Sequence, residues 1–295
     1  MLKIPLSCFN ISNYLTTFKI ENFYPINYSV YDEQAINIFF RNKDWRSEAI
    51  DFKVLSISVD FFKGDIFGVE IYEIGKQTRK LWHFKEFKDG YLFLGANVTQ
   101  ENNYHEVNAI IYDKSFQLQN EFSLGNGVED ILINRKNEIV VSYCDEGVYG
   151  DFGVSSHGVV KFSTSGELLW VNTKHRIDDC YAINFDSDEN LWFYYYDDFY
   201  LIKTNFEKES IYDPNITGSK TFMLNKKIDK IIMDKGYDKH DKFVVKSIKE
   251  GKFDKGEEVL FACKDIEIKP QTYLFYKSSI LFVDKNELFF GKWQD

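Results

Sequence analysis

The chain of 295 residues has little of what marks linkers, disulfide frameworks and membrane spans. Only 4 prolines occur, and no Pro- or Ser-rich stretch divides the chain. Its 4 cysteines lie far apart without a CxxC pair, which indicates thiols of a reducing compartment. No apolar run approaches the roughly 18 residues of a membrane span, and the first residues do not resemble a secretory signal. We therefore expect a cytoplasmic protein with no membrane contact.

Motifs of common catalytic sites are missing as well. There is no GxSxG elbow, no HExxH, no Walker loop, and no GxGxxG that leads into a helix. Ser155, Ser156 and His157 adjoin in sequence, which is not the arrangement of a nucleophile and its base. These absences favour a protein that is not an enzyme and that needs no cofactor.

Charge and aromatic content limit the function further. The net charge of −10 disfavours a general nucleic-acid-binding protein and leaves room for a basic partner. Hydrophobic residues make up 44% of the chain and aromatic residues 18%, which is enough for a sizeable core.

One pattern recurs along the chain: a short apolar strand, a turn of Asp, Asn, Lys or Gly, and a second strand. Its clearest copies are "ILINRKNEIVVSY" from 131, "INFDSDENLWFYYY" from 183, "IIMDKGYDKHDKFVVKS" from 231 and "ILFVDKNELFFGKW" from 280, with looser copies near 84 and 28. The starts of the second strands are 46 to 55 residues apart. Such a period, with short β-branched and aromatic runs, is typical of β-propeller blades.

The sequence therefore predicts an all-β, six-bladed β-propeller with four-stranded blades in a single domain over 1–295. The expected blades are 27–75, 80–125, 127–173, 178–224, 227–276, and 278–295 together with 1–26. In the last blade we expect two C-terminal strands, completed by N-terminal strands from "LKIPLSCFN" and "YLTTFKI". A β-sandwich or a pair of all-β domains is the alternative, which the even spacing disfavours.

The third blade shows the pattern most clearly. Its expected strands are 130–133, 138–143, 159–162 and 168–172, counted outward from the axis. The long connection "CDEGVYGDFGVSSHGVV", from 144 to 160, joins the second strand to the third. Long connections at 97 and 249 are expected on the same face, where binding residues would gather.

The turn and strand "DSDENLWF" resemble an element of six-bladed propellers of the gluconolactonase-like and NHL-type superfamily. The run from "VEDILIN" to "FYYYDD" is also similar to bacterial propeller-like proteins without an assigned activity. The gluconolactonase-like resemblance implies one divalent metal at the ring axis, with Glu129 as the residue that could match a ligand. Here "VED" replaces the family's Pro-Glu-Gly, and no other ligand can be assigned.

Acidic residues and a few aromatic and histidine residues are expected to gather on the long-loop face of the third and fourth blades. The candidate binding residues are Glu129, Asp130, Asp145, Glu146, Tyr149, Asp151, His157, His175, Asp178, Asp179, Asp197 and Asp198. An acidic, aromatic-edged concavity suits a cationic ligand, a metal or a basic protein surface. Each acid could instead cap a turn or remain solvated.

From these observations we expect a non-enzymatic binding protein with a protein partner. The specific version of this expectation is a basic toxin domain that it would inhibit as an immunity protein. The alternative is a metal-dependent, lactonase-like hydrolase or lyase that uses carboxylates at the propeller axis.

Overall fold

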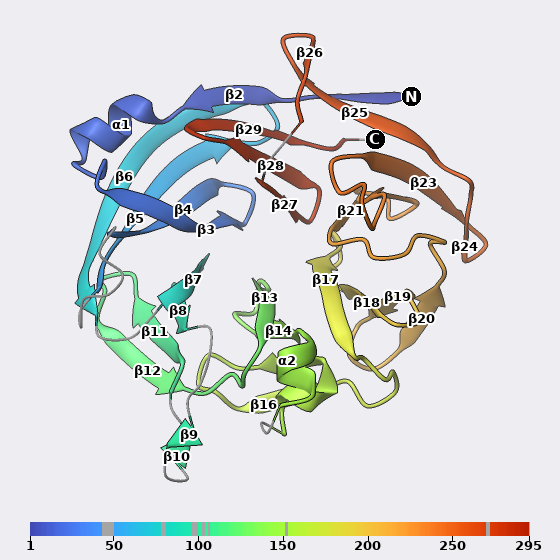
Figure 1. Ribbon diagram of the computed structural model, residues 1–295, viewed down its shortest axis with the longest axis horizontal. Coiled ribbons are helices and arrows are strands. Elements are labelled where there is room, and N and C mark those ends of the chain that lie inside the picture. The colour runs from blue at the N-terminus through green and yellow to red at the C-terminus, as the bar shows by residue number, and fades with distance from the viewer. Residues whose placement is uncertain are drawn as a thin grey trace.

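The computed structural model describes residues 1–42, 50–77, 81–95, 100–101, 104–105, 107–150, 153–269 and 272–294. Its sheets are arranged as a ring around a central axis, with the first strand of most sheets innermost (Figure 1). This arrangement is a β-propeller, so the predicted fold class is confirmed.

Five sheets of the described chain have four strands each, and a sixth sheet has seven. Blade 1 contains β3 (Phe23–Tyr31), β4 (Ala35–Asn42), β5 (Ile50–Asp60) and β6 (Asp65–Gln77). Blade 2 contains β7 (Leu81–Phe87), β8 (Gly90–Gly95), β11 (Ala109–Asp113) and β12 (Leu118–Phe122), with the small hairpin β9 (Gln100–Glu101) and β10 (Tyr104–His105) between β8 and β11. Blade 3 contains β13 (Val128–Ile133), β14 (Ile139–Tyr143), β15 (Val159–Phe162) and β16 (Leu168–Val171).

Blade 4 contains β17 (Asp179–Phe185), β18 (Leu191–Tyr196), β19 (Leu201–Thr204) and β20 (Glu209–Tyr212). The seven-stranded sheet contains β21 (Phe222–Leu224), β22 (Lys230–Asp234), β23 (Phe243–Lys249), β24 (Lys252–Phe253), β25 (Glu257–Cys263), β26 (Ile266–Glu267) and β1 (Leu2–Pro5). The last blade contains β27 (Thr272–Tyr276), β28 (Ser279–Asp284), β29 (Glu287–Lys292) and β2 (Ser7–Asn10). The helices are α1 (Ser12–Thr17), α2 (Asp145–Val148) and the 3₁₀ turn η1 (Ser155–His157). None of these described helices has the length and apolarity needed to cross a membrane.

The predicted number of blades is wrong. The described chain has five four-stranded blades rather than six, because the sheet between blade 4 and the last blade is not a four-stranded unit. Strand β1 adds to its edge in parallel with β25, and the short strands β24 and β26 pair with β23 and β25. Within blade 3, in contrast, all four predicted strands are confirmed to within two residues.

The core lies in the seams between neighbouring sheets. In β14, Val141 packs into the seam with blade 2, whereas its neighbour Val140 packs into the seam with blade 4. Side chains alternate between the two faces of a strand, so a strand buried on both faces reads as a continuous apolar run. The same rule explains "LWFYYY", in which Trp192, Phe193 and Tyr195 are at most 1% exposed.

The N-terminal segment connects two sheets. Strand β1 runs parallel to β25, with Leu2 opposite Val259, and β2 then pairs antiparallel with β29 of the last blade. Figure 1 shows the N-terminal strand along β25 and the C-terminus nearby. Ile4 and Leu6 are 4% and 7% exposed in the seam between these two sheets. This segment therefore closes the ring by hydrogen bonds and apolar burial together.

The expected second N-terminal strand, from "YLTTFKI", is wrong. Residues Ser12–Thr17 form α1, and Ile11 and Ile20 on either side of it are buried in the seam with blade 1. The last blade has no place for another strand, because β27, β28 and β29 supply three and β2 supplies the fourth.

The last two copies of the repeat are displaced by one strand from the prediction. "IIMDKGYDKHDKFVVKS" forms β22 and β23, and β21 is the strand nearest the axis. The segment 235–242 is therefore the loop on the binding face, whereas the stretch from 249 connects β23 to β25 through β24. The long connection near 97 lies largely outside the described residues.

Replacement of Leu6 by Ala is expected to lower the free energy of unfolding by about 3 kcal/mol, because it opens a cavity in a closed seam. Lys3→Ala, on the same segment, is expected to change it by less than about 0.5 kcal/mol because Lys3 and Asp265 form an exposed ion pair. Urea unfolding of the two variants tests this. A loss for Leu6→Ala as small as that expected for Lys3→Ala would show that burial of the N-terminal segment does not hold the ring closed.

Candidate functional site

Three predicted acids do converge at one end of the central channel. Glu129 opens β13, Asp145 begins α2 and Asp179 opens β17, so they come from three separate segments. Their electrostatic coupling shows the proximity: burial and then the charge of Asp145 raise the pKa of Asp179 to about 6. Burial and then the charges of Asp179, Asp130 and Asp145 raise the pKa of Glu129. We refer to Glu129, Asp145 and Asp179 as the acidic mouth.

Lys220 is the basic residue that opposes this charge. It lowers the pKa of both Asp179 and Glu129, without cancelling the effect of burial and of the other acids. The mouth is therefore a concentration of negative charge in which burial and neighbouring acids disfavour the ionisation of Glu129 and Asp179. A bound cation would relieve that repulsion.

The long connection after β14 folds so that it brings Asp145 to the mouth. The Cys144 amide donates to the Gly127 carbonyl at 2.9 Å, and Gly147 of α2 packs against Asn126 and Gly127 in the loop that precedes β13. A Cβ atom added at Gly127 would lie 2.2 Å from the Gly147 amide nitrogen, so this contact requires glycine. At the far end of the connection, the buried Ser155 hydroxyl accepts a hydrogen bond from the Asn126 amide at 2.9 Å.

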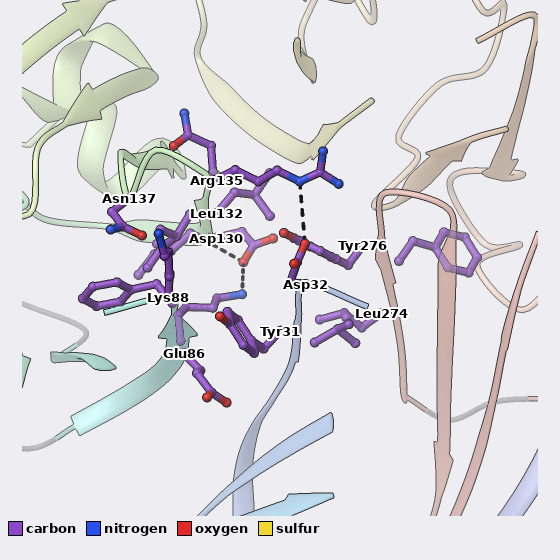
Figure 2. Close-up of a pocket in the computed structure, with 17 residues that line it drawn as sticks. Tyr31, Asp32, Glu86, Lys88, Asp130, Leu132, Arg135, Asn137, Leu274 and Tyr276 are labelled. Atoms are coloured by element: carbon purple, nitrogen blue, oxygen red, sulfur yellow. Dashed lines mark hydrogen bonds and ion pairs between the residues drawn. The ribbon is translucent and has the colours of Figure 1, made fainter. Parts of the chain in front are cut away.

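Asp130 points away from the mouth. Its Oδ1 lies 3.2 Å from the Lys85 ammonium nitrogen and accepts a hydrogen bond from the Ile131 amide at 2.7 Å. Its side chain lines a cavity of about 260 Å³ in the channel, bounded by β3, β7, β13 and β27 (Figure 2). Glu129 and Asp130 are therefore neighbours on β13, but Glu129 belongs to the acidic mouth and Asp130 lines the cavity.

The two predicted histidines hold loops rather than line the mouth. Nδ1 of His157 lies 3.0 Å from the Asn172 carbonyl oxygen, and Asn172 in turn donates to the carbonyl oxygens of His157 and His175. The His175 ring lies against Phe193 and Tyr195, and its Nε2 is 3.2 Å from Glu209 Oε2. These contacts fix the segment that leads to Asp179.

The remaining predicted residues come from three connections: Glu146, Tyr149 and Asp151 follow β14, Asp178 precedes β17, and Asp197 and Asp198 lie between β18 and β19. Asp178 accepts a hydrogen bond from Arg176 Nε at 3.1 Å. Tyr149 is 65% exposed, and hydrogen bonds with Tyr149 and Asp178 raise the pKa of Arg176. Glu146, Asp197 and Asp198 are exposed, while Asp151 lies outside the described residues.

An aromatic cluster beside Asp179 was not predicted. Tyr181 and Tyr237 share a hydrogen bond between their hydroxyls at 2.8 Å, and Tyr196 and Phe199 pack around Tyr181. Tyr196 and Tyr237 are 41% and 47% exposed. Tyr237 was missed because the repeat containing it is displaced by one strand, which moves its loop to the other face.

Asp234 fixes two elements of this cluster. Its buried carboxylate accepts hydrogen bonds from the amides of Lys220 and Thr221 at 2.7 and 3.0 Å on Oδ2, and from the Gly236 amide at 2.8 Å on Oδ1. Nδ1 of His240 lies 2.8 Å from Oδ1 as well. Lys220 and Tyr237 are therefore held at the mouth by one buried carboxylate.

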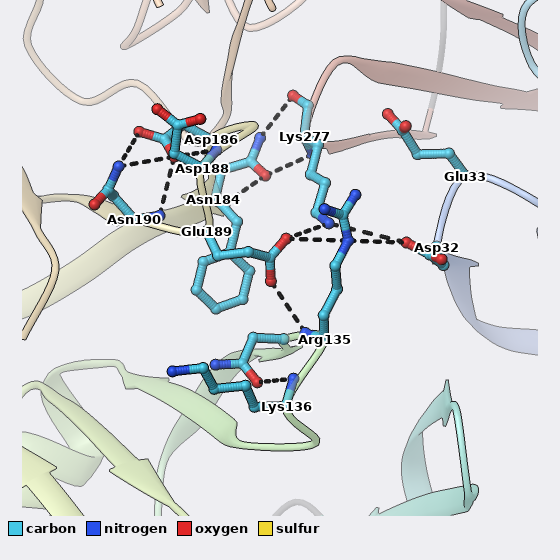
Figure 3. Close-up of polar contacts among 12 residues, drawn as sticks. Asp32, Glu33, Arg135, Lys136, Asn184, Asp186, Asp188, Glu189, Asn190 and Lys277 are labelled. Atoms are coloured by element: carbon cyan, nitrogen blue, oxygen red, sulfur yellow. Dashed lines mark hydrogen bonds and ion pairs between the residues drawn. The ribbon is translucent and has the colours of Figure 1, made fainter.

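Ion pairs connect the turns at the opposite end of the axis, as Figure 3 shows. Lys277 is 5% exposed and places its Nζ 2.5 Å from Glu189 Oε1, while the Arg135 amide donates to Glu189 Oε2 at 3.0 Å. Arg135 Nε is 3.8 Å from Asp32 Oδ1. This latch (Asp32, Arg135, Glu189 and Lys277) joins blades 1, 3 and 4 to the last blade.

The metal site implied at Glu129 does not fit the structure. Among the described residues, no three His, Cys, Asp or Glu side chains are arranged to bind one metal ion. The charges that act on Glu129 include that of Lys220, a cation, alongside those of the neighbouring acids. A metal-dependent lactonase-like reaction is therefore not favoured.

Comparisons with known proteins support the fold. No family model and no curated protein matches the sequence. The structure is similar to virginiamycin B lyase from Staphylococcus aureus, with a TM-score of 0.52, 12% identity, and coverage of 97% of this chain and 98% of that one. It is similar to a protein assigned as a gluconolactonase, with a TM-score of 0.50, 11% identity, and coverage of 98% and 93%. It is also similar to YCF48 bound to D1 peptide, with a TM-score of 0.52, 10% identity, and coverage of 99% and 98%. At these identities the likeness establishes the propeller fold alone.

Asp179→Asn is expected to raise the free energy of unfolding at pH 7 by about 1 kcal/mol, the amount left after solvent screening at a half-exposed site. The folded state raises the pKa of Asp179 from 3.8 to about 6, so its ionised form destabilises the fold above pH 6. The advantage of the variant should shrink as the pH falls from 6 to 4. Asp178→Asn, which removes a paired acid, should give no such gain; a gain there would contradict the assignment.

Lys277→Met is expected to lower the free energy of unfolding by about 3 kcal/mol, because Glu189 would keep a partly buried charge without its main partner. The double variant Lys277→Met/Glu189→Gln should recover at least half of that loss. Thermal unfolding measures both. No recovery in the double variant would contradict a pairing role for Lys277.

Proposed function

We propose that this protein is a non-enzymatic binding protein whose acidic mouth recognises a basic segment of a protein partner. The observation that carries the proposal is that Glu129, Asp145 and Asp179 come from β13, α2 and β17, of which β13 and α2 both pack against β17. Burial and then the neighbouring acids raise the pKa of Asp179 and Glu129, which agrees with this placement. Like charges held together by a rigid scaffold with only a partial counter-charge are costly unless a ligand of opposite charge compensates them.

The chemistry around the mouth supports a Lys or Arg side chain as the recognised group. Carboxylates accept charge-assisted hydrogen bonds from both cations. The faces of exposed tyrosines such as Tyr196 and Tyr237 offer cation–π contacts to the same side chain. A basic toxin domain, inhibited by the binding, is one partner of this kind.

A labelled peptide of alternating Arg and Gly serves as the probe, with the corresponding Glu and Gly peptide as its charge control. The variant Glu129→Gln/Asp145→Asn/Asp179→Asn is expected to bind the Arg peptide at least about tenfold more weakly, measured by fluorescence anisotropy. Affinity should also fall between pH 7 and pH 5, because protonation of Asp179 removes charge from the mouth.

The matched control is Asp197→Asn/Asp198→Asn, which removes two exposed acids from the same face. It should change the affinity by less than about twofold, since exposed charges outside the site act only through screened long-range attraction. Equal losses in the two variants would mean that net charge, and not the mouth, binds the peptide.

A further inference from the structure

The cavity in the channel is separate in chemistry from the acidic mouth. It has a volume of about 260 Å³, and Val30, Ile131, Leu274 and Phe275 contribute apolar wall. This is the volume of about nine water molecules in the liquid, enough for a compact organic molecule. Figure 2 shows Tyr31 and Leu274 on one side of the cavity and Asp130 near its centre.

Lys85 is the most unusual group in this cavity. The residue is 9% exposed, and its Nζ has Asp130 as its single hydrogen-bond acceptor among the described residues, at 3.2 Å. An ammonium carries three N–H donors, so two remain for another acceptor. Burial of unsatisfied donors is costly, which favours a bound molecule that brings an oxygen to Lys85.

Two further cations lie at the cavity. Lys88 lines it and forms no ion pair with a described residue, and Arg135 is 3.7 and 3.8 Å from its carboxylate partners, beyond hydrogen-bond distance. The acids of the lining are already paired: Asp130 with Lys85, Asp32 with Arg135 and Lys277, and Glu86 with Lys114. Lys88 is the lining charge without a partner among the described residues, which suits a single negative charge on the ligand.

Asn137 offers a hydrogen-bond acceptor to a ligand, whereas Lys85 offers donors. Its Nδ2 donates to Asp89, but its Oδ1 is buried and has no partner. A ligand that offers a hydroxyl or N–H would satisfy this acceptor, and the aromatic and aliphatic walls would cover an apolar body.

We propose that this cavity binds a small monocarboxylic acid that carries a compact apolar or aromatic body and one hydrogen-bond donor. The carboxylate accepts hydrogen bonds from Lys85, the body fills the space beside Leu274, and the donor reaches Asn137 Oδ1. The site lies at a different place from the acidic mouth and does not depend on the function proposed for it.

The test uses 4-hydroxyphenylacetate as the probe, with three matched compounds. Titration calorimetry should show saturable binding of the acid, and binding about tenfold weaker for 4-hydroxyphenylacetamide, which lacks the charge. Phenylacetate, which lacks the hydroxyl, should bind more weakly than the probe, and tyramine, a cation, should bind weakest. No saturable binding of the acid, or a preference for tyramine, overturns the proposal.

Variants locate the binding. Lys85→Met/Asp130→Asn removes both charges together, so no buried charge is left without a partner, and it should abolish the preference for acid over amide. Leu274→Phe should block binding by filling the cavity, and Glu129→Gln/Asp145→Asn/Asp179→Asn should leave it intact. Wild-type affinity for the acid in both the Lys85→Met/Asp130→Asn and Leu274→Phe variants overturns the assignment to this cavity, whatever the outcome of the peptide experiment.

Discussion

Burial of each sheet on both faces is the constraint on which this structure depends. A strand such as β14 contributes alternate side chains to two different seams, so no blade has a core of its own. Stability therefore requires that the ring close, and the N-terminal segment closes it by adding β1 to one sheet and β2 to the next. The ring in turn brings loops remote in sequence to a common axis.

The two ends of that axis differ in how their charges are arranged. At the latch, Lys277 and Arg135 meet Glu189, so charges of opposite sign connect the blades. At the mouth, burial and then neighbouring acids raise the pKa of Asp179 and of Glu129, with Lys220 as a partial counter-charge. Paired charges stabilise an assembly, whereas concentrated charge of one sign lowers its stability and attracts a ligand. The latch therefore serves the fold, and the mouth is the better candidate for recognition.

Much of the fold could be predicted from the sequence, because a strand buried on both faces leaves a continuous apolar run between turn residues. Blade 3 and the aromatic strand around Trp192 follow that rule. The seven-stranded sheet could not be predicted, since parallel pairing of β1 with β25 depends on a contact between residues more than 250 positions apart. The displacement of the last repeats could not be predicted either. The segment "DKGYDKHDK" has the composition of a turn, and composition does not tell on which face of the ring a turn lies.

The site could be predicted in part, because the order of strands in a blade fixes the face on which each connection lies. The order of strands identified Glu129, Asp145 and Asp179 as residues on one face, and the structure brings them together. It could not show that Asp130 turns toward Lys85, because the register of β13 against β14 shifts between Val128 and Asp130, and such a bulge changes side-chain direction locally. Nor could composition distinguish His157 and His175, which hold loops, from histidines that meet a ligand.

A carbon-detected NMR titration of Asp179 tests the central claim most directly. Burial of Asp179 and the nearby charge of Asp145 predict a pKa of about 6 for Asp179 in the wild-type protein. The Asp145→Asn variant should give a lower value, because it removes the charge of Asp145. A wild-type value close to the ordinary 3.8, or a raised value that Asp145→Asn leaves unchanged, would contradict the convergence of these acids.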